Sequence, residues 1–138
     1  MKKLAYRIQF LILVLWIPCV ILLFKIIPEK RVAALFAGAG FLVLPILFLI
    51  NEFRQKQQTG RFSKLHVFIC GEFLLVSSLP IFLLRILNWD ADFSQLSVMG
   101  IEANLLHRFS NTNYMLLLAS AAYLAFTAWR NEKSQPKG

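Results

Sequence analysis

The sequence is poor in charge and in the residues that carry most enzyme and metal chemistry. Charged side chains make up 16% of the 138 residues, whereas about 25% is typical of soluble domains. Two cysteines and two histidines are present, without a C-x-x-C pair or a Cys/His ligand spacing. We therefore expect no metal and no cofactor, and we expect Cys19 and Cys70 to be inert thiols within apolar runs.

Catalytic motifs are also missing. The sequence contains no H-E-x-x-H, no P-loop, no Rossmann glycine motif and no paired carboxylates. No Ser or Cys nucleophile stands near a His base. These absences favour a protein that is not an enzyme.

What the chain has in excess is apolar residues. They form 58% of the sequence, against about 45–50% in soluble domains, and about 20 of them in a row cross a bilayer core. The first run is too long for the core of a signal peptide, which has about 7–15 residues. We therefore predict an all-α integral membrane protein, a single domain over residues 1–138 with four transmembrane helices. The apolar runs lie at about 8–27, 32–50, 65–87 and 112–128, and a tail follows at 129–138.

Two polar segments separate the later runs. Residues 51–64 are basic and contain the helix breaker Gly60, which predicts a loop in water. Residues 95–109 repeat apolar side chains at three- and four-residue spacing, which predicts an extracytoplasmic amphipathic helix on the membrane surface. Its candidate contact residues are Val98, Ile101, Leu105, Phe109 and His107.

The basic residues indicate the orientation of the chain. A net charge of +8 would suggest nucleic-acid binding in a soluble protein, but here Lys and Arg flank the apolar runs, so no nucleic-acid partner is expected. With both termini and the 51–64 segment inside, ten of the 15 Lys and Arg residues are cytoplasmic, as the positive-inside rule requires. The remaining five are Lys25, Lys30, Arg31, Arg85 and Arg108. The sequence therefore predicts a multi-pass protein of the cytoplasmic (inner) membrane with both termini cytoplasmic.

Glu72 is the main candidate functional residue, because it lies about eight residues, or roughly 12 Å, into the third run. It is the acidic residue that falls within an apolar run. An ionisable group at that depth is either a proton or cation site or a protonated group that bonds to a neighbouring helix. For the second alternative, the expected partners are in the fourth run, for example Ser120, Tyr123 or Thr127.

Two further residues are candidates with weaker support. His66 lies one residue into the third run, where it either marks the interface or handles a proton or ligand. Arg85 lies near the outer end of the same run, where a long side chain reaches water. Alternatively, Arg85 pairs with an acidic residue that follows it: Asp90, Asp92 or Glu102.

The leading hypothesis is therefore a non-enzymatic accessory, assembly or immunity-type partner of a membrane complex. About 80 residues are needed for four spans, which leaves little of the chain for a catalytic domain. The alternative is an oligomeric transporter or channel subunit for a small solute, proton or cation, which uses Glu72. The expected partners are the lipid bilayer and either another membrane protein or a second copy of the chain.

Overall fold

Long helices dominate the computed structural model, which describes residues 2–133. Helix accounts for 85% of these described residues. The long helices are α1 (Lys2–Ile26), α2 (Lys30–Thr59), the continuous series α3 (Lys64–Glu72), η1 (Phe73–Ser78) and α4 (Leu79–Leu87), and α5 (Ala103–Lys133). A short 3-10 turn, η2 (Phe93–Gln95), and a two-stranded hairpin, β1 (Ser97–Val98) and β2 (Ile101–Glu102), connect α4 to α5.

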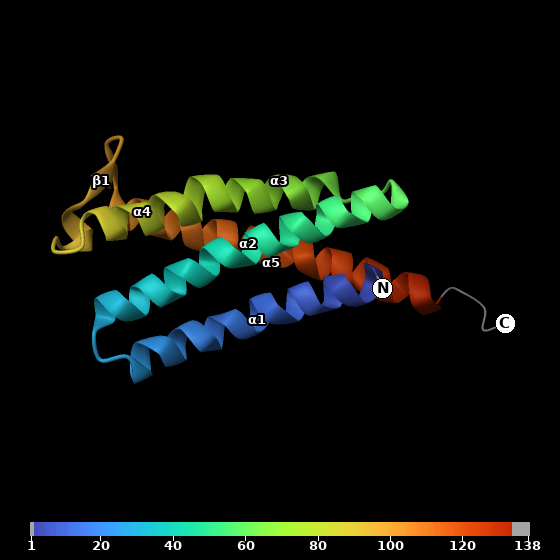
Figure 1. Cartoon of the computed structure of the whole chain (residues 1–138), viewed down its shortest axis with the longest axis horizontal. Helices are drawn as coiled ribbons and strands as arrows, with labels where there is room; N and C mark the ends of the chain where they lie inside the picture. Colours follow the sequence, from blue (N-terminus) through green and yellow to red (C-terminus); the bar gives the residue numbers. More distant parts are fainter. Residues whose placement is uncertain (1, 134–138) are drawn as a thin grey trace.

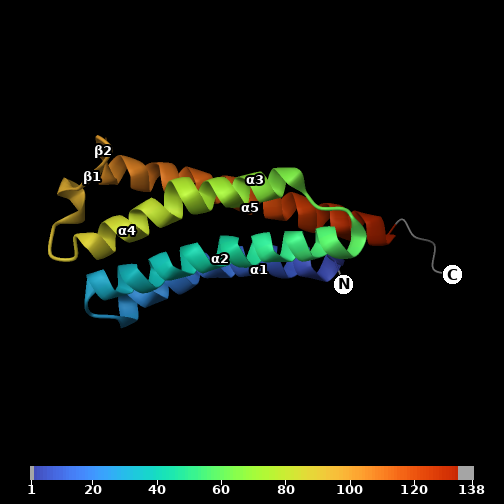
Figure 2. The ribbon, with the colours of Figure 1, turned by 45° about the horizontal axis from the view of Figure 1, so that its top comes forward.

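The helices form an antiparallel bundle in which α1 contacts α2 and α5, and α3 contacts the same two helices from the opposite side (Figure 1). The start of α1, the α2–α3 connection and the end of α5 share one end of the bundle. The α1–α2 turn and the 88–102 segment share the other end. Toward this second end α5 diverges from the α1–α2 pair, as Figure 2 shows.

Within residues 2–133, three helices are long and apolar enough to cross a membrane: Leu4–Ile26, Lys30–Thr59 and Lys64–Leu87. Apart from Ile27, they include the first three predicted spans, so the expectation of an all-helical chain with helices able to span a membrane is confirmed in this coarse form. The more polar α5 is outside this set. The fourth span and the orientation of the chain therefore belong to the proposals below.

The structure corrects three segment predictions. The amphipathic helix at 95–109 is wrong, because residues 97–102 form the hairpin and the helix begins only at Ala103. The water loop at 51–64 is wrong over most of its length, because α2 continues to Thr59 and only 60–63 are non-helical. The tail is also shorter, since residues 129–133 continue α5 and 134–138 lie outside the described residues.

Turn chemistry explains the hairpin. Met99 and Gly100 have φ values of 52° and 82°, and a two-residue hairpin turn with positive φ at both positions matches the twist of the flanking strands. Gly100 adopts this conformation without steric cost. A three- and four-residue apolar spacing therefore does not produce a helix here.

A widened helical turn interrupts the third apolar helix. In the π-helix η1 the Leu79 N–H donates to the Leu74 carbonyl, five residues earlier, and Pro80 follows without an N–H to donate. This wider turn brings Phe73, Ser77 and Ser78 to the buried side together. Polar hydroxyls thereby face the bundle interior.

The apolar core is centred on aromatic rings. Phe41 of α2 meets the rings of Trp16, Phe73 and Tyr114 edge-on, with centroids 6.1, 6.3 and 5.3 Å apart. Such edge-to-face pairs are favourable beyond the area that they bury. The aromatic cluster therefore joins α1, α2, η1 and α5.

Gly40 gives a direct test of this packing, since the Trp16 indole lies where a Cβ at position 40 would stand. We expect Gly40→Ala to destabilise the fold by about 1–3 kcal/mol, as other overpacked cores are. Gly71→Ala is the matched control, because its Cβ would meet nothing within 4 Å. Thermal unfolding in detergent should show a lower Tm for Gly40→Ala alone, and an equal Tm for both variants would contradict the packing of Trp16.

Candidate functional site

Glu72 lies in a polar network at the middle of the bundle. The Asn113 side-chain amide of α5 donates to Glu72 Oε1 at 2.7 Å and to Ser77 Oγ at 2.8 Å. Asn113 and Ser77 are buried, whereas Glu72 is only partly covered. The carboxyl group is thus held from the protein side while part of it faces outward.

The network depends on two local features. The π-turn η1 turns Ser77 inward within one and a half turns of Glu72, and Asn113 stands opposite both residues on the buried side of α5. A primary amide has two N–H donors, and here both are used. This arrangement fixes Asn113 and leaves the second oxygen of Glu72 available for a proton or another partner.

The partner of Glu72 differs from the examples expected from the sequence. Ser120 instead bonds to His66, and Tyr123 is exposed. Asn113 was missed because it lies at the polar edge of the 112–128 run. The available signal was a side-chain amide next to an apolar helical run, because such amides form hydrogen bonds between membrane helices.

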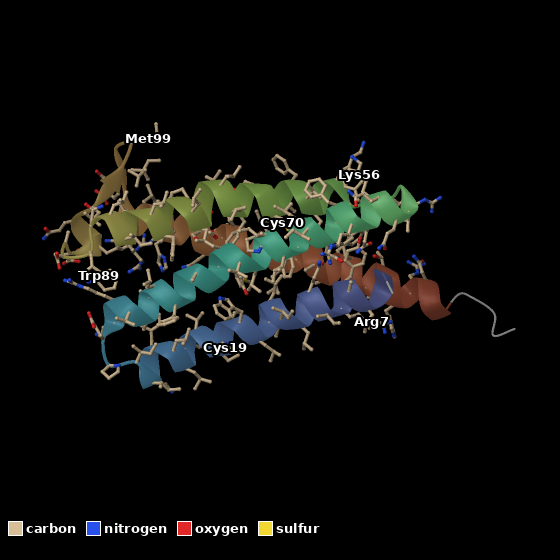
Figure 3. All side chains as sticks on the ribbon, viewed as in Figure 1. Arg7, Cys19, Lys56, Cys70, Trp89 and Met99 are labelled. Carbon is tan, nitrogen blue, oxygen red and sulfur yellow. The ribbon has the colours of Figure 1, made fainter. Side chains whose placement is uncertain are left out.

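His66 lies inside the bundle, with 1% of its surface exposed. Its Nδ1 is 2.9 Å from Ser120 Oγ, its Nε2 is 3.6 Å from Cys70 Sγ, and its ring stacks on Phe48. Both ring nitrogens therefore have protein partners, and α3 is tied to α5 at a second point. The expectation that no Ser or Cys lies near a His is wrong, because the fold brings Ser120 and Cys70 to the two ring nitrogens. Cys70 is buried beside it, and Cys19 is exposed on α1 (Figure 3).

A fully buried carboxyl group lies in the part of α2 that the sequence had indicated as a loop. Glu52 is fully buried and accepts the Ser63 backbone N–H at 2.9 Å through Oε2. Gln9 and Gln55 are also buried, and Tyr6 lies next to Glu52 and Gln55. The signal in the sequence was the continuation of the buried stripe of α2, with Glu52 and Gln55 following Phe48 at helical spacing.

Arg85 lies at the divergent end of the bundle, with its guanidinium 4.0 Å from the centroid of the Phe93 ring. None of the three acidic partners considered from the sequence forms an ion pair with it in residues 2–133; Asp90 instead pairs with Arg31 at 3.8 Å. The Ser94 backbone N–H donates to Asp92 and lowers the pKa of that carboxyl group. Arg85 is therefore a cation whose main contact is an aromatic face.

The five residues proposed as surface-helix contacts are divided between two elements. Val98 and Ile101 pair across the hairpin, while Leu105, His107 and Phe109 are exposed on α5. They do not form one helical face. His107 lies close enough to Arg85 for an electrostatic interaction.

Comparison of the chain with family models, curated proteins and solved structures returned no match. Within residues 2–133, no group of three or more His, Cys, Asp or Glu side chains is arranged to hold a metal ion. The chemistry available at the site is that of hydrogen bonding and of a single carboxyl group.

Removing the Asn113 amide should weaken the bundle. We expect Asn113→Ala to cost about 1 kcal/mol, because two hydrogen bonds of roughly 0.6 kcal/mol each are lost within membrane-type helices. The exposed Asn104 of the same helix is the control, and Asn104→Ala should leave stability unchanged. Unfolding in a mixed detergent series measures both, and equal effects would contradict the network.

Proposed function

We propose that the chain is a non-enzymatic, four-span protein of the cytoplasmic (inner) membrane that acts as an accessory, assembly or immunity-type partner of a membrane complex. One observation carries this proposal. A polar face of α5 is exposed at the level where the other three long helices are most apolar. A polar surface in that position requires a partner.

The level of α5 follows from its side-chain bonds. The Tyr114 hydroxyl donates to the Leu13 carbonyl of α1 at 2.6 Å, and Asn113 bonds to Glu72 of α3. Leu13 lies about four residues before the middle of the 8–27 run, and Glu72 lies about four residues before the middle of the 65–87 run. Helix α5 runs antiparallel to both α1 and α3 (Figure 1). With an equal rise per residue, both contacts support a middle of the apolar band near residue 109 of α5, which differs from the 112–128 span expected from the sequence.

The residues around this level form an outward polar face. They follow four-residue spacing, all are exposed, and they lie opposite the buried side that contains Asn113. They are Asn104, Arg108 and Thr112, whereas His107 and Asn111, although exposed, line the cavity between α1, α2, α4 and α5. An arginine at the centre of a transmembrane helix costs about 2.5–3.5 kcal/mol on insertion scales.

A protein partner would remove this cost. Polar side chains within membranes face a helix interface or a water-filled cavity, and they pair there with opposite charges or carbonyl groups. The fitting partner is a transmembrane helix that presents a carboxylate or carbonyl oxygen to Arg108 and hydrogen-bonding groups to Asn104 and Thr112. This chemistry favours a specific protein contact over lipid alone.

The alternative is self-association into a transporter or channel that uses Glu72. Its support is the partly exposed carboxyl group held by Asn113. A single four-helix bundle is too thin for a wide pathway, so this function requires several copies. The oligomeric mass therefore distinguishes the two functions.

The α5 face is tested by Arg108→Leu combined with Thr112→Leu, because both residues are exposed and neither lines a cavity. We expect this variant to fold and to lose its partner, because the contact depends on the polar groups that it removes. The measurement is the mass of the complex isolated from its native membrane in nanodiscs. The control replaces two exposed apolar residues of α1, Leu15→Ala and Leu22→Ala, and should keep the complex.

A heteromeric complex that is lost only in the α5 variant supports the accessory function. A homo-oligomer supports the transporter alternative instead. A monomer in native membranes, or a complex that both variants retain, would contradict the proposal.

The proposed orientation places both termini and the α2–α3 connection in the cytoplasm. Arg7 and Lys56 lie at that end of the bundle, whereas Trp89 and Met99 lie at the opposite end (Figure 3). Basic residues near span ends favour the cytoplasmic side. The basic 51–64 segment therefore supports an orientation in which this end of the bundle faces the cytoplasm.

Labelling of single cysteines tests this orientation. In a background with Cys19→Ala and Cys70→Ala, we expect Gln57→Cys to react with an impermeant maleimide only from the cytoplasm and Asp92→Cys only from outside. Both positions are exposed. Labelling of position 57 from outside would overturn the orientation.

A further inference from the structure

The divergent end of the bundle contains two adjoining cavities. The first, of about 480 Å³, lies between α1, α2, α4 and α5. The second, of about 510 Å³, lies between the α1–α2 turn and the 88–96 segment. The two cavities share Phe24, Ala34 and Arg85 in their linings, so Arg85 stands at their junction.

The first cavity is an apolar slot. Its lining includes Ile17, Ile21 and Phe24 of α1, which repeat at about one helical turn, with Ala37 and Phe41 of α2 and Phe82 of α4. Polar groups enter it from α5, where His107 and Ser110 are located. Its volume falls within the roughly 300–1,000 Å³ of typical ligand pockets.

The second cavity is cationic. Lys30, Arg31 and Arg85 line it, and Asp92 is the acidic residue in the same lining. The pair between Arg31 and Asp90 is solvent-exposed and 3.8 Å long, so it is worth little and leaves Arg31 able to bind another anion. Asn88 and Trp89 add hydrogen-bond donors at the same place.

We propose that the two cavities together bind one anionic phospholipid. The phosphate of the headgroup lies between Lys30, Arg31 and Arg85, and one acyl chain occupies the slot. Basic pockets between transmembrane helices are recognised headgroup sites for acidic lipids. The basic residues of the second cavity favour a negatively charged headgroup. The apolar slot favours a ligand with an acyl chain over a soluble phosphate.

The test measures lipid retention by native mass spectrometry of the full chain. Dioleoyl phosphatidylglycerol is compared with dioleoyl phosphatidylcholine, which has the same chains and no net charge. We expect one phosphatidylglycerol per chain to be retained preferentially. Arg85→Gln and Lys30→Gln should each weaken this preference roughly fivefold, the equivalent of about 1 kcal/mol per basic residue.

Lys25→Gln is the charge-matched control, because Lys25 is exposed at the same end and lines neither cavity. It should leave the preference unchanged. Val20→Phe narrows the slot while keeping every charge, and it should reduce retention of the lipid without lowering Tm.

Competition with soluble glycerol 3-phosphate shows whether the site binds the headgroup alone or the whole phospholipid. At millimolar concentration it should not displace the phospholipid, because it lacks the chain. Equal retention of the two lipids, equal effects of Lys25→Gln and Arg85→Gln, or displacement by glycerol 3-phosphate would each overturn the proposal.

Discussion

The bonds that α5 makes with its neighbours determine the arrangement of this bundle. Apolar helices slide past one another at little cost in lipid, because lipid tails are as apolar as the helix surfaces. Directed hydrogen bonds remove that freedom. Asn113 to Glu72 and Ser77, Tyr114 to the Leu13 carbonyl, and Ser120 to His66 fix α5 against its neighbours at two levels, one at residues 113–114 and one at residue 120.

This register has a functional consequence. It sets the polar first half of α5 beside the apolar middle of α1 and of the α3–η1–α4 series, and it sets Trp129 beyond the start of α1. Polar groups on the inward side of α5 are satisfied within the bundle, whereas those on the outward side, such as Arg108, are exposed. The same helix therefore stabilises the fold on one side and offers a contact surface on the other.

Apolar run length was sufficient to predict the first three long helices, because about 20 apolar residues in a row have few other stable arrangements. It failed at 51–64, since Glu52 and Gln55 continue the buried stripe of α2 although they are polar. It also failed at 95–109, where the Met99-Gly100 turn outweighs the helical spacing. Glu72 was recognised from its depth, but Asn113 was not, because a pairing between distant helices leaves no local pattern.

The depth of α5 in the bilayer tests the account most directly. Spin labels are attached at the exposed positions Phe109 and Phe126. Their accessibility to oxygen and to a water-soluble nickel reagent reports their depth in the bilayer. A label at Ile17 of α1 is the reference for the middle of the apolar band. The account predicts that Phe109 is as deep as Ile17 and that Phe126 lies near the headgroups. A span centred on residues 112–128 would make Phe126 the deeper of the two, and that result would contradict the register.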